Sequence, residues 1–329
     1  MLLQYYLIDK DSVKFTTQYT KKLSVKIYTN LLTLRLLEEN SGFLYKLGKI
    51  RGFCHLVIGQ ENIYISLQQV LDKNDKVIGS YRCHGLAYIC NITPEQIMAE
   101  MLGKSNGICK GKGGSMHLYN EQFYGGHGIV GAQISLGTGI AFALQYKNMN
   151  NVCFVFYGDG ASNQGQAFES FNMAKLWKLP VVYVCEANKY GMWTPEENIC
   201  SNTEYFKRGG NIPGIRISDE HIDKLIDIFK YAREYALKYG PIILQIDTYR
   251  LCNHSCLDIK DFYRSKEEVD KQKEKDCLKI FREELKNFIS EDEIKIIEND
   301  VLKKFEEEAK KAEFGIELIY KELFKDVYK

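Results

Sequence analysis

The segment from residue 152 to residue 191 constrains the fold more than any other part of this chain. It reads VCFVFYGDGASNQGQAFESFNMAKLWKLPVVYVCEANKYG. The apolar run at 152–157 predicts a buried strand, residues 164–179 have the period of a helix, and 180–185 predicts a second strand. A third apolar run follows at 242–247. Strands and helices alternating at this spacing predict an α/β fold, with a parallel sheet covered by helices on both faces.

Polar residues follow the first two of these strands. Asp159 lies between Gly158 and Gly160 after the first strand, and Asn188 follows the second. Because the carboxyl ends of parallel strands meet at one edge of a sheet, we expect Asp159 and Asn188 to converge. Oxygen ligands of this kind suit Mg²⁺, which usually keeps part of its coordination shell for diphosphate oxygens and water. The glycines let a ligand approach the backbone, and the next helix begins where an anion is favoured.

A dinucleotide-binding fold is the alternative for this segment, since Glu186 ends the second strand where a ribose-binding acid would lie. The glycine pattern disfavours it. Asn163 stands where the third glycine of G-x-G-x-x-G belongs, and Asp159 would repel a bare pyrophosphate unless a cation lay between them. The segment therefore favours a site for a metal and a diphosphate.

The remaining chain has three further features. In residues 16–46, apolar residues recur at intervals of three and four, which predicts one long helix. Thr93-Pro94-Glu95-Gln96 has the pattern of a helix N-terminus, and this helix is expected to end near Gly103. Residues 103–139 are too rich in glycine for regular structure, which predicts loops that approach a ligand. After Ser265 the chain is highly charged and helical in period, with a capping box at Ser290 and Glu293.

Composition excludes two classes of function. The 44 Lys and Arg residues nearly balance the 43 Asp and Glu residues, so the net charge of +1 creates no field that would recruit nucleic acid. No run approaches the roughly 20 apolar residues of a membrane-spanning helix. The ten cysteines show no C-x-x-C spacing, which indicates reduced thiols inside a cell rather than a disulfide framework.

The whole pattern resembles a known family. GDG followed by Asn at the end of the next strand resembles the thiamine diphosphate motif. The neighbouring segments are similar to the alpha subunits of pyruvate dehydrogenases rather than to branched-chain enzymes, over nearly the whole chain from about Thr16. These segments are RGFCHLVIGQE, SYRCHG, GKGGSMH, FYGGHGIVGAQ, NKYGM and FKRGG.

The resemblance implies a thiamine diphosphate-binding fold and a set of site residues. It implies Mg²⁺ held by the side chains of Asp159 and Asn188 and by the main-chain oxygen of Tyr190. It also implies that Tyr81, Arg82 and Arg250 face the diphosphate, and planar guanidinium groups suit that role. Further cofactor-binding residues implied in this way are Phe53, His55, Gly128, Val130, Gly158, Gly160, Ala161 and His254.

The same resemblance implies the reaction. Thiamine diphosphate would carry out the decarboxylation of pyruvate, and His254 matches a histidine beside the reacting atoms, where a group titrating near neutrality suits proton transfer. The alternative that Cys252, His254 and Cys256 form a zinc fragment is disfavoured because no further ligands follow nearby. Ser255 matches a serine that family kinases phosphorylate.

Partners follow from what the chain lacks. Too few residues remain after the GDG half for a second sheet domain, so a beta subunit is expected to complete the site in an assembly of two alpha and two beta chains. The acetyl group would pass to a lipoyl domain of the acetyltransferase core. We expect residues 1–265 to form the cofactor-binding domain and 266–329 a C-terminal helical segment packed on it.

Several positions depart from the family pattern. Ala187 replaces an Asn, Trp193 and Gly210 replace a Gly and an Asp, and Cys252-Asn253 replaces His-Gly before His254. None of these is an expected metal ligand, so activity is still expected. The alternatives are the alpha subunit of an acetoin or other 2-oxo acid dehydrogenase, and a catalytically silent partner that binds cofactor or beta chain.

Location is the last expectation. The family indicates the mitochondrial matrix or a reduced mitochondrial organelle. Residues 1–15 contain Asp9 and Asp11 and no Arg, which leaves little room for a transit peptide and keeps the cytosol open as an alternative.

Overall fold

The computed structural model describes residues 2–258 and 263–326. Its main sheet has seven strands in the order β1-β8-β9-β5-β4-β2-β3. Strand β1 is antiparallel to β8, and all other neighbours in this sheet are parallel, which confirms the predicted α/β class. The strands are β1 (Leu3–Tyr6), β2 (Lys76–Ser80), β3 (Phe123–His127), β4 (Cys153–Gly158), β5 (Val181–Ala187), β8 (Gly214–Ser218) and β9 (Ile242–Asp247), with a separate hairpin of β6 (Tyr190–Gly191) and β7 (Thr194–Pro195).

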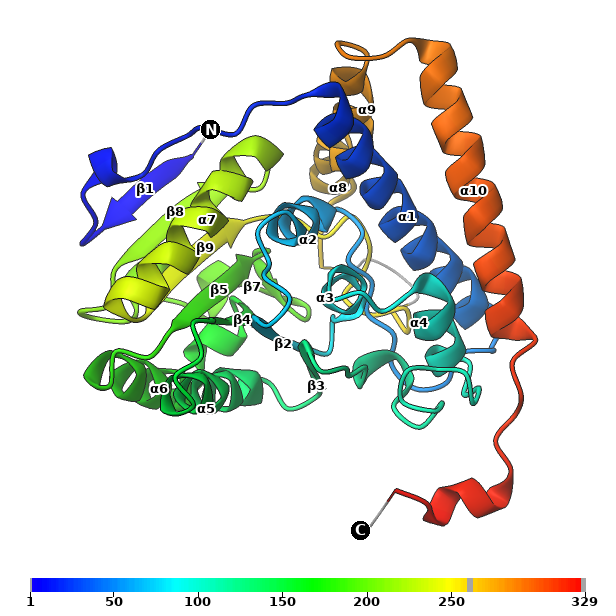
Figure 1. Ribbon diagram of the computed structural model, residues 1–329, viewed down its shortest axis with the longest axis horizontal. Coiled ribbons are helices and arrows are strands. Elements are labelled where there is room, and N and C mark those ends of the chain that lie inside the picture. The colour runs from blue at the N-terminus through cyan, green and yellow to red at the C-terminus, as the bar shows by residue number, and fades with distance from the viewer. Residues whose placement is uncertain (1, 259–262, 327–329) are drawn as a thin grey trace.

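The central strands are apolar on both faces because helices cover both faces. On β4, Phe154 and Phe156 pack into one hydrophobic core, while Val155 and Tyr157 pack into a second core on the opposite face. The first core lies under α2 (Glu61–Gln68), α3 (His84–Ile89) and α7 (Ile222–Tyr239), and the second lies under α5 (Ala132–Tyr146) and α6 (Gly165–Leu176). Figure 1 shows α5 and α6 together on one side of the sheet and α7 on the other.

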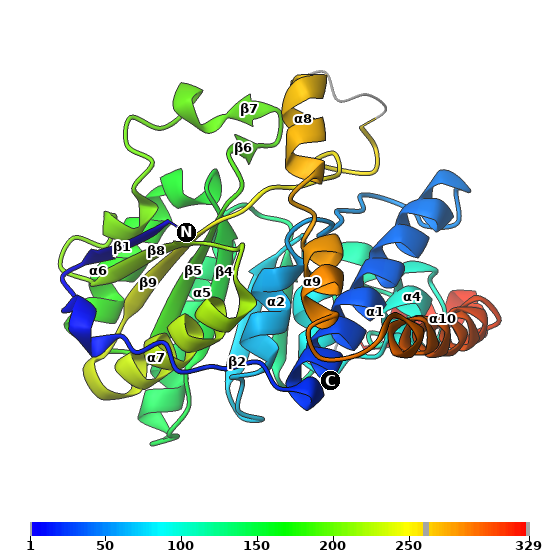
Figure 2. The ribbon, with the colours of Figure 1, turned by 90° about the horizontal axis from the view of Figure 1, so that it is seen from above.

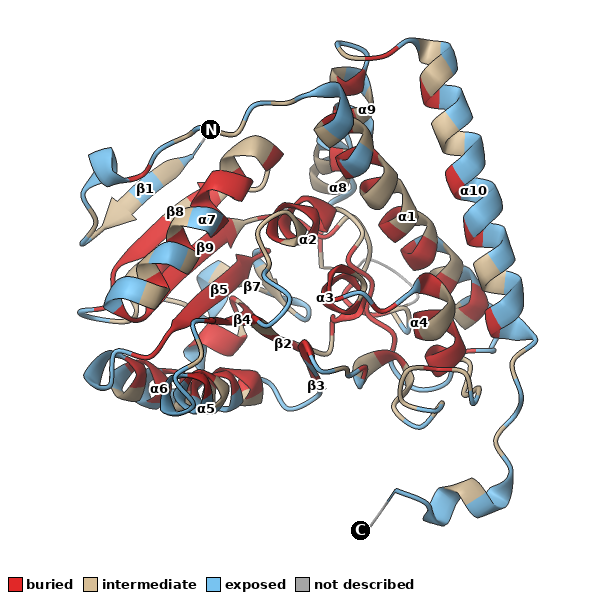
Figure 3. Ribbon diagram, viewed as in Figure 1, coloured by how far each residue is buried: buried red, intermediate tan, exposed pale blue. Residues whose placement is uncertain are grey.

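A further helical layer packs outside α2 and α3. Helix α1 (Lys21–Lys46) contacts α2, α4 (Pro94–Met101), α9 (Cys277–Leu285) and α10 (Glu291–Glu313). Helix α10 runs along α1 at the edge of the molecule, with its outer side exposed (Figures 1 and 3). The remaining helical elements are α8 (Lys266–Lys273) and six short 3₁₀ turns at Lys10–Ser12, Gly114–Met116, Ala161–Asn163, Glu196–Asn198, Tyr205–Lys207 and Tyr320–Phe324.

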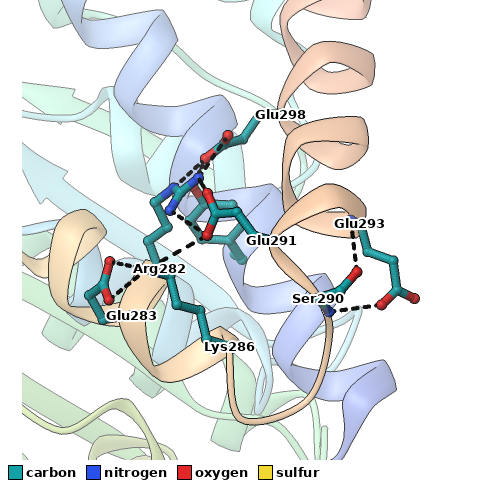
Figure 4. Close-up of polar contacts among 8 residues, drawn as sticks. Arg282, Glu283, Lys286, Ser290, Glu291, Glu293 and Glu298 are labelled. Atoms are coloured by element: carbon teal, nitrogen blue, oxygen red, sulfur yellow. Dashed lines mark hydrogen bonds and ion pairs between the residues drawn. The ribbon is translucent and has the colours of Figure 1, made fainter.

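Local sequence signals explain where several helices begin. The predicted capping boxes are both present, at Thr93 with Gln96 and at Ser290 with Glu293. Beside the second box, Arg282 on α9 pairs with Glu291 at 2.6 Å and with Glu298 at 2.7 Å, which ties α9 to the first turns of α10 (Figure 4). Among the helices of the described residues, none combines the length and apolarity of a membrane span.

One expectation from the sequence was wrong. Residues 103–139 are not free of regular structure, because β3 and the first half of α5 lie within them. Gly137 explains the error. It lies inside α5, where an added Cβ would come within 2.3 Å of a Val155 methyl group. Its lack of a side chain therefore lets α5 pack closely on β4, and the glycine is a packing residue rather than a loop residue.

The carboxyl ends of the parallel strands meet at one edge of the sheet. The β6–β7 hairpin and α8 lie together beyond this edge in Figure 2. The Tyr190 hydroxyl of β6 donates to Glu268 of α8 at 2.9 Å, and the Tyr249 hydroxyl donates to the same carboxylate at 2.8 Å. These hydrogen bonds anchor the segments that border the site described next.

Candidate functional site

Asp159 and Asn188 converge as the sequence predicts. They follow β4 and β5, which are adjacent parallel strands with Gly158 opposite Glu186. A cavity of about 510 Å³ opens beside them at the strand ends. Nearly all of the predicted site residues line it, namely Phe53, His55, Tyr81, Arg82, Gly128, Val130, Gly158, Asp159, Gly160, Ala161, Asn188, Tyr190 and His254.

Asp159 has one carboxylate oxygen available for a ligand. Its Oδ1 accepts a hydrogen bond from the Gly160 amide at 2.7 Å, while its buried Oδ2 has no hydrogen-bond partner among the described residues. Burial raises the pKa of Asp159 to about 6, because the charged form is costly away from water. A cation at Oδ2 would remove this cost.

Arg250 is the predicted site residue that lies behind the cavity lining. Its side chain is 1% exposed, and its Nε donates to Asn188 Oδ1 at 3.2 Å. Its Nη2 is buried and has no hydrogen-bond partner among the described residues. Burial, together with the neighbouring charge of Arg82, lowers the pKa of Arg250. The guanidinium therefore orients Asn188 and keeps one donor for an anion.

Arg82 holds the histidine loops together. Its Nη1 donates to the Leu56 carbonyl at 2.6 Å, and its Nη2 donates to the His254 carbonyl at 2.9 Å. Both terminal nitrogens are thus engaged by main-chain oxygens from two segments that are distant in sequence. Arg82 supplies positive charge to the cavity and also fixes the positions of these segments.

The two cavity histidines, His55 and His254, lie edge to face at 5.2 Å between ring centroids, with the Tyr81 ring beside both. The Nδ1 atoms of both histidines are buried without a hydrogen-bond partner in the described chain. Burial and the charge of Arg82 lower the pKa of His55 to about 2 and that of His254 to about 3. Both imidazoles are therefore neutral at physiological pH, and His254 differs here from the expectation of a group that titrates near neutrality.

Sequence reasoning missed several polar residues of the cavity. Gln60 and Gln133 line it with buried amide atoms that lack partners among the described residues. Glu186 also lines it and accepts a 2.5 Å hydrogen bond from the Tyr64 hydroxyl, and burial raises its pKa to about 7. The sequence suggests a role for Glu186 only as a ribose ligand in the disfavoured dinucleotide-binding alternative. Its position one residue before Ala187, at the end of a buried strand, was the signal for a role in the site.

The departures from the family pattern have local structural explanations at two positions. Gly210 adopts a φ of +60°, a left-handed conformation that glycine adopts more readily than Asp. The Asn253 side chain donates to the Asp258 carbonyl at 2.9 Å and so closes the turn that carries His254. Ala187 is buried in β5, and Trp193 lies partly exposed in the turn of the β6–β7 hairpin.

The donor set fits a magnesium diphosphate better than a metal held by protein alone. Within the described ranges, no group of three or more His, Cys, Asp or Glu residues could hold an ion. Asp159 and Asn188 supply oxygen atoms, and Mg²⁺ bound by few protein groups typically completes its shell with phosphate oxygens and water. Arg250, whose Nε bonds to Asn188, adds a buried guanidinium with one unpaired nitrogen close to these oxygen donors.

The fold and this site define a class of dehydrogenase component. A family model described as "Dehydrogenase E1 component" matches residues 29–317. This chain belongs to that family, as the sequence motifs predict.

Several proteins similar to this chain are alpha subunits of mitochondrial pyruvate dehydrogenases. The mitochondrial pyruvate dehydrogenase E1 component subunit alpha of Kluyveromyces lactis is 43% identical, over 98% of this chain and 79% of the relative. The type I mitochondrial subunit of Ascaris suum is 42% identical, over 94% of this chain and 79% of the relative. The testis-specific mitochondrial form of Rattus norvegicus is 43% identical, over 90% of this chain and 77% of the relative.

Proposed function

We propose that this chain is the alpha subunit of a pyruvate dehydrogenase that decarboxylates pyruvate and transfers the acetyl group to a lipoyl domain, leading to acetyl-CoA. The observation that carries the proposal is the cavity at the ends of β4 and β5, where Asp159 and Arg250 each keep one buried polar atom unpaired. The identity of 42–43% to pyruvate dehydrogenase alpha subunits over most of the chain supports pyruvate as the substrate.

The cofactor is thiamine diphosphate, which members of this family use. When bound, it supplies the nucleophile and the electron sink for decarboxylation. We assign the side chains of Asp159 and Asn188 and the main-chain oxygen of Tyr190 as Mg²⁺ ligands. Arg250, Arg82 and Tyr81 provide the positive charge and the donors that face the diphosphate.

The role that we assign to the cavity histidines is proton transfer beside the reacting atoms. His254 and His55 are neutral and buried, and both rings contact Tyr81 in tilted or edge-on geometry, so each presents an unprotonated ring nitrogen. Arg82 fixes His254 through its carbonyl. We assign His254 as the residue that accepts and returns a proton during acetyl transfer, because proton transfer requires a positioned group rather than a mobile one.

A beta subunit completes the site. Large apolar side chains are exposed at the cavity-lining Val130, at Leu136 and Phe142 on α5, and at Phe168 and Trp177 on and after α6, and the Phe142 and Trp177 rings lie 5.5 Å apart. Exposed apolar side chains in such number often mark interfaces. We propose that the beta chain covers this surface in an assembly of two alpha and two beta chains, and that the lipoyl domain reaches the site from outside.

Substitution of Asp159 tests the site. Asp159→Ala removes the carboxylate that bridges protein and cation, so thiamine diphosphate binding at ordinary Mg²⁺ concentrations is expected to be lost. Asn188→Ala should weaken binding less, because an amide carries no charge. Calorimetry on the assembled alpha–beta complex measures both affinities, with Asp300→Ala as a control at an exposed position on α10. Unchanged affinity in Asp159→Ala would refute the metal assignment.

Substrate trials separate the remaining alternatives. The reconstituted complex is expected to release CO₂ from pyruvate faster than to turn over acetoin or branched 2-oxo acids. A catalytically silent partner would release none, although Asp159, Asn188 and His254 are all present. We place the chain in the mitochondrial matrix, which its relatives' names support, and treat residues 1–265 as the cofactor-binding domain with 266–329 packed on it.

A further inference from the structure

Residues 252–258 separate two cavities. His254 lines the cofactor cavity, whereas Cys252, Ser255 and Cys256 line a second cavity of about 440 Å³. Phe43 and Ile58 belong to the wall of the second cavity, which is mainly apolar. A small uncharged molecule can therefore reach the Cys256 side of this segment without entering the cofactor cavity.

Cys256 lies directly against Cys54 of the facing loop. The Cys256 amide donates to the Cys54 carbonyl at 2.8 Å, and the Ser255 hydroxyl donates to the same carbonyl at 3.4 Å. A direct main-chain hydrogen bond brings the two residues into contact, as a disulfide requires, since its Cα atoms are usually about 4.4–6.8 Å apart. The two thiols also lie close enough for each to shift the pKa of the other.

We propose that Cys54 and Cys256 form an oxidation site for hydroperoxides, in which Cys256 reacts first and Cys54 then closes a reversible disulfide. Neither cysteine has a part in the proposed decarboxylation. The bond would join the loop that carries His55 to the loop that carries His254, on the side facing away from the cofactor.

The chemistry balances with a hydroperoxide as the oxidant. The Cys256 thiolate attacks one peroxide oxygen, the O–O bond breaks, and the other oxygen leaves as water or an alcohol after taking up a proton. The Cys54 sulfur then attacks the sulfenic sulfur of Cys256. The S–O bond breaks, and the hydroxide combines with the Cys54 proton to leave as water. Two thiols are oxidised and one peroxide is reduced.

The two sulfurs differ in the way that this order requires. Cys54 is fully buried, while Cys256 is partly exposed to the second cavity. The neighbouring Cys54 side chain lowers the pKa of Cys256, and the nearby His84 and Arg82 act in the same direction against burial and the charge of Glu38. The Cys256 side chain, together with burial, raises the pKa of Cys54. The exposed sulfur is therefore the one with more thiolate.

Cys252 lines the same cavity, and its position makes it a matched control. Its Sγ lies 3.5 Å from the Leu56 carbonyl, to which it donates. Because Cys252 and Cys256 are only four residues apart, a linked peptide alone would not distinguish them. Cys252→Ser is expected to keep the link to Cys54, and Cys256→Ser is expected to abolish it.

The test uses the full chain, reduced, freed of reductant and treated with hydrogen peroxide. Mass spectrometry of non-reduced peptides should find Cys54 linked to Cys256, with full reversal by dithiothreitol. Cys54→Ser should instead accumulate a sulfenic acid at Cys256 that dimedone traps, because the second thiol is missing.

Two results would overturn the proposal. One is a wild-type chain whose Cys54 and Cys256 stay reduced while other cysteines, such as Cys109 or Cys200, are oxidised. The other is oxidation of Cys256 to the sulfinic acid without any link to Cys54. Circular dichroism of each variant before treatment shows that the fold is intact, so a missing link cannot be attributed to unfolding.

Discussion

Single residues locate the site through buried polar atoms without partners. Buried polar groups in proteins are normally hydrogen-bonded. Asp159 Oδ2, Arg250 Nη2, His254 Nδ1 and Gln133 Oε1 are exceptions among the described residues, and they gather at or directly behind one cavity. A charged or polar ligand that satisfies several of them at once compensates for the cost of keeping them unpaired.

A buried network of hydrogen bonds joins four segments of the chain. Glu38 on α1 and Ser115 contact the two ring nitrogens of His84, each at 2.8 Å, and Glu38 also accepts from the Val57 amide at 3.0 Å. Glu38 and His84 are fully buried. Each hydrogen bond of this network is therefore expected to strengthen the others and to stabilise the fold.

Ser115→Ala tests this hydrogen-bond network. The substitution leaves the buried Nε2 of His84 without its partner, so the free energy of unfolding should fall by about 1–3 kcal/mol. Urea denaturation measures the change. Ser24→Ala is the control, because the Ser24 hydroxyl is equally buried but has no partner among the described residues. A loss for Ser115→Ala no larger than that of the control would contradict the prediction.

A negative charge at Ser255 is expected to affect acetyl transfer. Ser255 is buried, its hydroxyl donates to Cys54 and accepts from the Leu257 amide, and its own amide donates to Asp258. A phosphate here would add about two negative charges beside a diphosphate and next to His254. Ser255→Glu should therefore disorder the loop and sharply slow acetyl transfer to a lipoyl domain, with less effect on cofactor binding. Wild-type transfer rates in the complex with the beta subunit would rule the switch out, and Ser255→Ala serves as the neutral control.

At the scale of elements, one carboxylate attaches the N-terminal segment to the domain. Asp227 on α7 accepts hydrogen bonds from the Thr16 and Thr17 amides at 2.7 and 2.8 Å and from the Thr17 hydroxyl at 2.6 Å. Burial opposes ionisation of Asp227, but these hydrogen bonds outweigh burial and lower its pKa. The carboxylate thus fixes the chain immediately before α1.

The lowered pKa of Asp227 predicts a pH-dependent contribution to stability. Because the folded pKa lies below the unfolded value of about 3.9, the contribution is complete above that value and is lost as the pH falls through the folded pKa. Asp227→Asn should lower the free energy of unfolding by roughly 1–3 kcal/mol at neutral pH. The difference from wild type should shrink below about pH 4.

Denaturation of the Asp227 variant across pH measures this difference. Asp223→Asn is the matched control on the same helix, since that carboxylate is partly exposed and pairs with Lys224 at 3.4 Å. An equal loss in both variants, or a difference that does not vary with pH, would contradict the assignment.

At the scale of the whole molecule, the apolar surface of α5 and α6 predicts how the subunit assembles. Leu136→Lys places a charge within this surface, so affinity for the beta chain should fall at least about tenfold, or roughly 1.4 kcal/mol. The isolated chain should be inactive in either form. Ile296→Lys is the control, because Ile296 is equally exposed on α10, on another part of the molecule.

Co-purification and titration calorimetry with the beta chain measure both variants. Equal binding by Leu136→Lys and wild type would move the interface elsewhere. Pyruvate decarboxylation by the monodisperse alpha chain alone would refute the shared site.

The sequence by itself determined the parallel sheet, the convergence of Asp159 with Asn188, both capping boxes and the family. These depend on local order along the chain, since a strand that ends in GDG and its parallel neighbour must finish at the same edge. Sequence also indicated which residues gather in the cavity, because the motifs carry them together.

Only the tertiary structure decided the rest. Gly137 proved to be a packing residue within a helix, which the sequence could not show, because a glycine can equally indicate a loop or a close helix–strand contact. In the folded structure, the terminal nitrogens of Arg82 donate to the Leu56 and His254 carbonyls, and Cys54 lies against Cys256. Contacts between residues about 170 to 200 positions apart leave no period or spacing in a sequence, and they arise only when the folded segments meet.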